Sequence, residues 1–166
     1  MRRTPTLALP ILALALLAGP VSGAGAAGCA EAAEKAVRAL LATQSAAWNR
    51  GDLGAFTAVY AEDAAFLSPT GLTHGRQQVL ARYRKRYPDK RAMGTLRLEV
   101  VEARPFASAG AGAAAGSGCQ VPGVSVAARW QLAYPDQPGK KTAEGLTLLV
   151  LRHRGETWEI VQDASM

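Results

Sequence analysis

The sequence is poor in the residues that most metal and redox sites need. It holds two histidines and two cysteines in 166 residues, and it has no CxxC pair. His74 and His153 each lack a second histidine or a cysteine at the spacing of metal ligands, so we expect no metal site. No serine–histidine–acid set is evident. These absences lead us to expect no bound cofactor.

A phosphate-binding glycine loop is also missing. Four of the 17 glycines lie in one low-complexity stretch, residues 107–118, which consists almost only of alanine, glycine and serine. This stretch lacks the preceding strand and the following helix that a phosphate loop needs. Because no core can be built from such residues, the stretch predicts a long flexible hairpin tip.

Long hydrophobic runs are absent. The apolar stretch near the N-terminus, Leu7–Ala18, has about a dozen residues, whereas a membrane-spanning helix needs about 20. Arg2 and Arg3 precede it and small residues follow it, which is the order of a secretory signal peptide. We therefore expect residues 1–26 to be removed and the protein to be exported, either to the periplasm or out of the cell. An uncleaved membrane anchor is the alternative.

Acidic residues are fewer than basic ones, 13 against 19, but the excess is modest. The formal charge of +6 falls to +4 when Arg2 and Arg3 are removed with the signal peptide. The main basic cluster is Arg82, Arg84, Lys85, Arg86, Lys90 and Arg91. These charges encircle a helix rather than form one stripe, so they favour a solvated face and no nucleic-acid partner. Binding to anionic polymers or lipid head groups is the alternative.

The two cysteines, Cys29 and Cys119, leave three alternatives open. In an oxidising compartment they could form a disulfide, worth roughly 4–5 kcal/mol in the chain-entropy model because the closed loop is long. Cys29 could instead carry a lipid anchor, since Ala26-Ala27-Gly28-Cys29 loosely resembles a lipid-attachment motif; the leucine usual three residues before the cysteine is replaced by Ala26. Two unpaired thiols are the third alternative.

The rest of the chain, residues 27–166, has the length of one domain. Its first half shows apolar residues at helical spacing, with Gly51 as a helix stop and Asp52 as the next N-cap. The predicted helices span 31–49, 53–61 and 76–87.

From residue 95 onwards the apolar period changes to two, which is typical of strands. The predicted strands span 64–68, 95–104, 124–134, 142–153 and 157–163. A phase shift at Val100-Val101 predicts a β-bulge. Three helices followed by hairpin-connected strands indicate an α+β fold, with the helices packed on a curved antiparallel sheet.

Several short motifs occur in a recognisable order. They are Ala47-Trp48-Asn49-Arg50-Gly51-Asp52-Leu53, Tyr60-Ala61-Glu62-Asp63 with Phe66, Gly75-Arg76, Arg82-Tyr83 with Tyr87-Pro88, Met93-Gly94, Arg129-Trp130, and Trp158 with Ile160-Val161. In this order, residues 32–165 resemble the SnoaL-like branch of the nuclear-transport-factor-2-like superfamily, which includes ketosteroid isomerase. The resemblance implies a cone-shaped barrel with an internal pocket, usually a homodimer through the sheet.

The catalytic groups of ketosteroid isomerase are not retained. Its general-base aspartate corresponds to Ser68, and a hydroxyl cannot serve as a free base near neutral pH. Its oxyanion-hole tyrosine corresponds approximately to Gln44, whose amide is a weaker donor. The His-Asp-His run that often ends the last strand of this branch is here Gln162-Asp163-Ala164, which leaves Asp163 as its one carboxylate.

We expect a ligand pocket between the first and third helices and the concave face of the sheet. Its predicted lining is Gln44, Trp48, Tyr60, Ser68, Tyr83, Tyr87, Trp130 and Gln162. Strict alternation would put Gln162 on the core face with Ile160, and would turn Asp163 away unless the strand bulges. If Asp163 does face the cavity, it is the candidate general base, and burial would raise its pKa. Otherwise it is an exposed strand-end residue.

Two functional hypotheses remain. In the first, the protein binds a small apolar or aromatic molecule in the pocket, with catalysis left open. In the second, it is a non-catalytic dimeric interaction module with a vestigial pocket. The missing bases at Ser68 and Gln162 favour binding over chemistry.

Overall fold

In the computed structural model, residues 24–106 and 121–166 are described. The signal-peptide prediction before Ala24 and the predicted hairpin tip at 107–118 lie outside the described residues. No helix in the described part of the chain is long and apolar enough to cross a membrane. Cys29 is disulfide-bonded, and Cys119 lies outside the described residues.

The helices of the described chain occupy its first half. They are α1 (Ala24–Asn49), α2 (Leu53–Ala58), α3 (Arg76–Arg86) and the short α4 (Lys90–Met93). Gly51, with a φ of 81°, makes the break after α1. Asp52 then caps α2, because its side chain accepts a 2.8 Å hydrogen bond from the Ala55 amide. The sequence predicted this break and this cap.

Six strands in the described residues form one sheet. They are β1 (Tyr60–Ser68), β2 (Gly71–His74), β3 (Thr95–Phe106), β4 (Gly123–Ala133), β5 (Ala143–Arg154) and β6 (Thr157–Ser165). Their order across the sheet is β2-β1-β6-β5-β4-β3. All neighbouring pairs are antiparallel except β1 and β6, which run parallel. The predicted antiparallel sheet is therefore confirmed with one exception.

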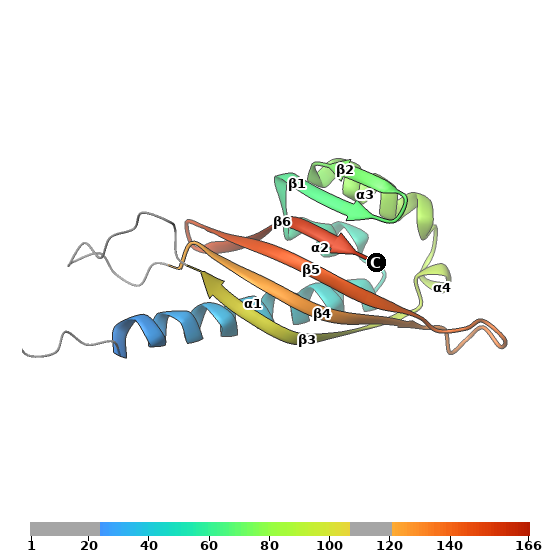
Figure 1. Ribbon diagram of the computed structural model, residues 1–166. Helices are drawn as coiled ribbons and strands as arrows, with labels where there is room; N and C mark the ends of the chain where they lie inside the picture. Colours follow the sequence, from blue (N-terminus) through green and yellow to red (C-terminus); the bar gives the residue numbers. More distant parts are fainter. Residues whose placement is uncertain (1–23, 107–120) are drawn as a thin grey trace, which may run out of the picture.

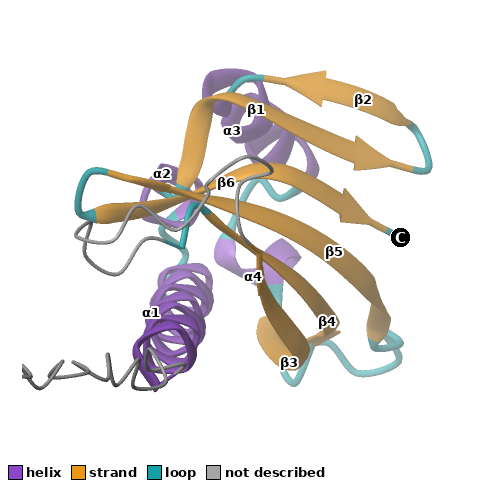
Figure 2. Ribbon diagram, turned by 60° about the vertical axis from the view of Figure 1, so that its left-hand side comes forward, coloured by secondary structure: helices purple, strands orange, loops and turns teal. Residues whose placement is uncertain are grey.

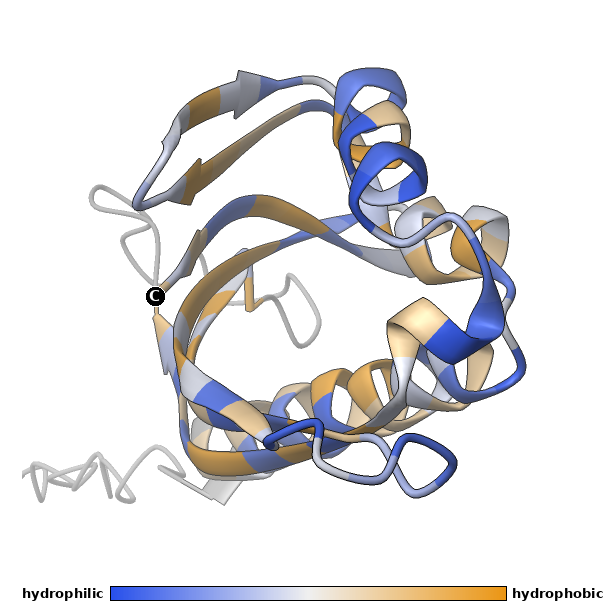
Figure 3. Cartoon of the chain, turned by 90° about the vertical axis from the view of Figure 1, so that its right-hand side faces the viewer, coloured by the Kyte–Doolittle hydropathy of each residue, from blue (hydrophilic) through white to orange (hydrophobic). Residues whose placement is uncertain are grey.

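The sheet curves around an interior that the helices close (Figures 1 and 2). Helix α1 lies along the β3 and β4 side, whereas α3 lies beside β1 and β2 (Figure 2). Val37, Leu41 and Trp48 on one side of α1 are buried in the core. Helix α3 is largely hydrophilic (Figure 3), and Val79 is its one buried residue. This arrangement is the predicted α+β cone.

Some predicted boundaries were wrong. The second helix ends at Ala58, and the chain enters β1 at Tyr60, so the predicted helix over 53–61 ran into a strand. Strand β2 and helix α4 were not predicted, because four-residue elements carry almost no periodic signal. The predicted bulge is confirmed, since the β3–β4 register skips Val101.

A second bulge, in β6, decides which side chains face the interior. Val150 pairs with Gln162 but Leu151 pairs with Ile160, so Val161 is the extra residue. The side-chain alternation restarts after it, which leaves Gln162 exposed and Asp163 buried. The prediction that Gln162 lines the pocket is therefore wrong, because strict alternation does not hold across Val161.

Candidate functional site

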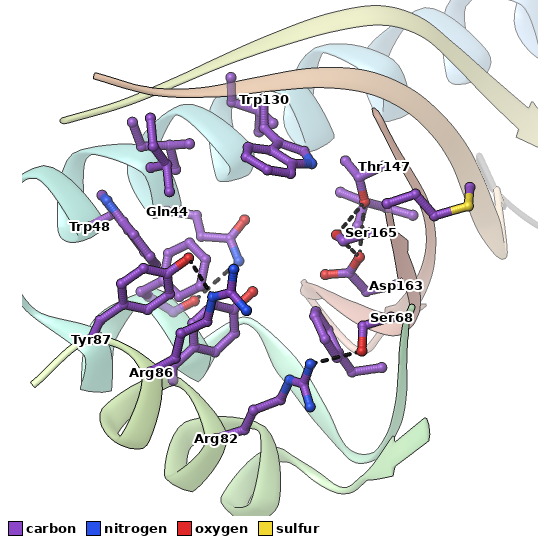
Figure 4. A pocket seen from close by; sticks show the side chains of 18 of the residues that line it. Gln44, Trp48, Ser68, Arg82, Arg86, Tyr87, Trp130, Thr147, Asp163 and Ser165 are labelled. Atoms are coloured by element: carbon purple, nitrogen blue, oxygen red, sulfur yellow. Dashed lines mark hydrogen bonds between the residues drawn. The ribbon is translucent and has the colours of Figure 1, made fainter. Parts of the chain in front are cut away.

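The concave side of the sheet and the helices enclose a cavity of about 430 Å³ (Figure 4). On one wall, aromatic side chains from α1, α2 and the C-terminal end of α3 meet edge to face. The Trp48 ring centroid lies 5.0 Å from that of Phe56 and 4.8 Å from that of Tyr87. The Phe56 ring centroid in turn lies 5.1 Å from that of Tyr83. Such contacts hold the rings in fixed orientations, so this wall is rigid and apolar.

Leucine side chains from the sheet, Leu96, Leu98, Leu132 and Leu149, line the cavity as well. Trp130 on β4 extends over the cavity, with its indole nitrogen on the side where Thr147 lies (Figure 4). That nitrogen is buried and has no hydrogen-bond partner in the described residues. Because an unpaired buried donor is costly, this N–H is available to an acceptor placed in the cavity.

The polar end of the cavity is built around Asp163. Its carboxylate is 5% exposed and accepts three hydrogen bonds, all from hydroxyl groups. Tyr60 Oη donates to Oδ2 at 2.6 Å. Thr147 Oγ1 and Ser165 Oγ donate to Oδ1 at 2.9 and 2.7 Å. No cationic side chain in the described residues contacts this carboxylate, so its charge is met by hydroxyl dipoles alone.

Burial raises the pKa of Asp163 above its ordinary value of 3.8, although the three hydroxyl donors oppose the shift. Burial and the nearby carboxylate raise the pKa of Tyr60 well above its ordinary range, and the pKa of Tyr83 is shifted in the same direction by the same two causes. Both tyrosines are therefore neutral phenols at any physiological pH. Of these three residues, Asp163 is the one whose protonation can change in the acidic-to-neutral range.

Gln44 offers the cavity a hydrogen-bond acceptor, whereas the sequence predicted a donor there. Its Nε2 donates to the Phe56 carbonyl at 3.1 Å. Phe56 lies in the last turn of α2, where carbonyl groups have no partner within the helix, so the amide group supplies one. Since a carbonyl can accept only from the amide nitrogen, the side-chain oxygen is turned to the cavity (Figure 4).

Two arginines from α3, Arg82 and Arg86, lie at the mouth of the cavity. Arg82 Nη2 donates to Ser68 Oγ at 2.7 Å and to Thr70 Oγ1 at 2.9 Å. Its guanidinium also sits 5.3 Å from the centroid of the Phe66 ring. The position that holds a base in ketosteroid isomerase thus holds a hydroxyl bound to an arginine.

The structure brings seven of the eight predicted lining residues around one cavity. They are Gln44, Trp48, Tyr60, Ser68, Tyr83, Tyr87 and Trp130. Gln162 lies outside it, and Asp163 faces it.

Sequence reasoning missed Thr147 and Ser165, the two hydroxyl partners of Asp163, and it read Arg82 and Arg86 as a solvated surface. The i, i+4 spacing of the two arginines was the available signal, because it puts both on one side of a helix. In the described residues no group of three or more histidine, cysteine or acidic side chains is placed to hold a metal ion.

Helices packed into a curved sheet around an internal cavity define the α+β cone of the nuclear-transport-factor-2-like fold. The chain belongs to the SnoaL-like domain family, whose model matches residues 37–160. No curated protein matches its sequence.

Solved structures show the same fold. An NTF2-like protein of unknown function from Shewanella oneidensis MR-1 is 28% identical, with a TM-score of 0.65 over 79% of this chain and 96% of that one. A domain of unknown function from Nostoc punctiforme PCC 73102 is 24% identical, with a TM-score of 0.63 over 81% and 76%. A ketosteroid isomerase-like protein from Erwinia carotovora atroseptica is 14% identical, with a TM-score of 0.58 over 80% and 93%.

Proposed function

We propose that this protein binds a small molecule with a largely apolar or aromatic body inside the cavity. The observation that carries the proposal is the combination of a rigid aromatic wall with a few convergent polar groups in a space of about 430 Å³. Ligand sites of proteins have this composition, with most of the lining apolar and a few polar groups fixing orientation. Here the orienting groups are Asp163, the Gln44 oxygen and the free Trp130 N–H.

The same geometry supports Asp163 as the acid–base group for any reaction at this site. The carboxylate is held by three hydroxyl donors, and its raised pKa brings it toward the range in which a base or an acid is useful. Replacing Asp163 by Asn keeps the shape but removes the titratable proton. We expect this variant to lose any turnover while staying folded. Unchanged turnover would leave binding alone as the function.

Thermal unfolding in the presence of a panel of steroids, polyketides and simple aromatic compounds tests the binding proposal. A ligand at about 100 times its dissociation constant should stabilise the folded protein by about 2.7 kcal/mol. The matched control is Leu98→Trp, which puts a larger side chain into the cavity without touching Asp163. Binding that persists unchanged in this variant, or stabilisation by none of the compounds, would contradict the proposal.

We also propose that the protein is exported. The support is the order of Arg2-Arg3, the apolar stretch Leu7–Ala18 and the small residues after it. N-terminal sequencing of the protein from its own cells should give a start near Ala27. An intact Met1 on cytoplasmic protein would contradict export.

A second candidate function is that of a dimeric interaction module, and one observation favours it. On β5, Leu146 and Leu148 are 55% and 51% exposed, on the side opposite the cavity. Two neighbouring leucines on the outer face of a sheet form an apolar surface that a second copy of the chain could cover. A homodimer is compatible with a ligand-binding cavity, since the two use opposite faces of the sheet.

A further inference from the structure

The mouth of the cavity carries two arginines that form no ion pair in the described residues. Arg82 and Arg86 lie one turn apart on α3 and both line the cavity. Neither forms an ion pair with any carboxylate in the described part of the chain. On the same helix, Arg84 and Lys85 are exposed, as Arg86 is, but they do not line the cavity. The charge at the mouth is thus a property of two positions, not of the whole basic helix.

Both guanidinium groups keep unused donors. Arg82 uses only Nη2, toward two neutral hydroxyls, which leaves Nε and Nη1 without a hydrogen-bond partner in the described residues. Arg86 uses only Nε, which donates to Tyr87 Oη at 3.1 Å, and leaves both Nη atoms. In Figure 4 the Arg86 guanidinium points into the cavity rather than away from it. An arginine fork with free donors is suited to a carboxylate, sulfonate or phosphate group.

Two carboxylates, Asp163 and Glu144, also line the cavity, and neither forms an ion pair with Arg82 or Arg86 in the described residues. In the described residues, Asp163 on β6 accepts hydrogen bonds from hydroxyl groups and from neither arginine. Arg86 extends into the cavity from α3, whereas Arg82 reaches the end of β1, where it binds Ser68 (Figure 4). The aromatic rings of Trp48, Phe56 and Tyr83 are packed among themselves at this cavity. A molecule that filled this space would therefore meet an apolar wall along its body and cationic donors at one end.

We propose that the ligand of this cavity is a small organic anion, with its negatively charged group held by Arg82 and Arg86 and its apolar body against the aromatic wall. This inference rests on the proposed binding function and adds the charge of the ligand to it. It selects between ligands of similar size and shape, since only an anion can form charge-assisted hydrogen bonds with the arginine donors.

A matched pair of fluorescent probes tests the inference. 8-Anilinonaphthalene-1-sulfonate and N-phenyl-1-naphthylamine share one ring system, and only the first carries a negative charge. We expect both to bind the wild-type protein, and the sulfonate to bind at least about tenfold more tightly, because charge-assisted hydrogen bonds are stronger than neutral ones. Competition between the two probes establishes that they share one site.

Variants of the helix locate the effect. R82Q/R86Q should weaken sulfonate binding about tenfold or more and change binding of the neutral probe less than twofold. The matched control R84Q/K85Q removes the same charge from exposed positions of the same helix and should leave both affinities within about twofold. If R82Q/R86Q loses the neutral probe as well, the single variant R86Q replaces it, since the one side-chain hydrogen bond of Arg86 in the described residues goes to Tyr87.

The outcomes separate this inference from the binding proposal. Equal affinity of the two probes, or no effect of R82Q/R86Q on the sulfonate, overturns the anion preference and leaves the binding function standing. Equal losses in R82Q/R86Q and R84Q/K85Q show a general attraction of the basic helix and also overturn it. If neither probe binds the folded wild-type protein, both proposals fail.

Discussion

Tyr60 and Asp163 are 103 positions apart in the sequence, yet the tyrosine hydroxyl donates a 2.6 Å hydrogen bond to the carboxylate. The first strand and the last strand lie side by side in the sheet, which is what brings the two residues together. Tyr60 is 1% exposed, so neither partner can exchange this bond for one to bulk water. The stability of the fold and the chemistry of the cavity therefore depend on the same contact.

Replacing Tyr60 by Phe removes one of three donors to Asp163 and leaves the ring in place. We expect a loss of about 1–3 kcal/mol in the free energy of unfolding, because the bond is buried and its acceptor is a carboxyl group. Denaturant unfolding measures it. Tyr87→Phe is the control: in the described residues the Tyr87 hydroxyl hydrogen-bonds to Arg86 alone, near the surface, so its removal should cost less than about 1 kcal/mol.

Replacing Asp163 by Asn should change how stability depends on pH. The folded pKa of Asp163 is raised above its ordinary value of 3.8, so the folded state binds this proton more tightly than the unfolded state. The stability this group contributes is full below about pH 3.8 and is lost as pH rises through the raised folded pKa. The wild type should therefore lose stability relative to Asp163→Asn on going up in pH from about 3.8.

Urea unfolding of both proteins at a series of pH values between about 3 and 8 measures this difference. The difference in the free energy of unfolding between the two proteins should stop growing once the pH exceeds the folded pKa of Asp163. The carboxyl group is then ionised in the folded and the unfolded state. A difference that stays constant across the series, or one of opposite sign, would show that burial does not raise this pKa.

Replacing Gly145 by Ala should disturb the packing of β5 against Met166, the last residue of the sequence. A Cβ at Gly145 would collide with the Met166 carbonyl oxygen and lie 2.6 Å from the Trp130 ring. We expect a cost of about 1–3 kcal/mol, the usual range for overpacking, together with a change in Trp130 fluorescence. Gly28→Ala is the contrast: a Cβ at Gly28 would meet no atom within 4 Å beyond its chain neighbours and its own helix backbone, and alanine favours a helix, so a small gain is expected.

Replacing Leu148 by Lys tests the proposed homodimer. A charge in the middle of an apolar interface is costly, so light scattering should show a dimer for the wild type and a shift toward monomer for Leu148→Lys. Leu72→Lys is the control, because Leu72 is equally exposed, at 54%, but lies on the edge strand β2. A monomeric wild-type protein would remove the dimer proposal.

The sequence was sufficient to predict the fold, because helix spacing, helix caps and strand alternation all agreed with one arrangement. The Gly51 break, the Asp52 cap and the Val101 bulge are local features, and they were predicted correctly. The boundary between α2 and β1 was not, since Tyr60 and Ala61 continue an apolar pattern that fits a helix as well as a strand. The position of this boundary depends on the pairing of Tyr60 with β6, which no local pattern contains.

The site was harder to predict than the fold. Trp48, Tyr83 and Tyr87 could be placed because a helix fixes which side chains share a face. The orientation of Asp163 depends on the unpaired Val161, and an extra residue in a strand leaves no mark in the alternation before it. The role of Arg82 could not be separated from that of its basic neighbours, because charge alone does not tell a cavity mouth from a solvated surface.

The bulge at Val161 also has a consequence for how this chain is compared with its relatives. A shorter chain without that residue would run from Ile160 through Gln162 to Asp163 in regular alternation, and the same acid would still face inwards. Counting residues from Ile160 therefore does not identify equivalent acids across the family, whereas their pairing partner on β5, Leu149, does. For the same reason a chain lacking Val161 should keep an intact cavity.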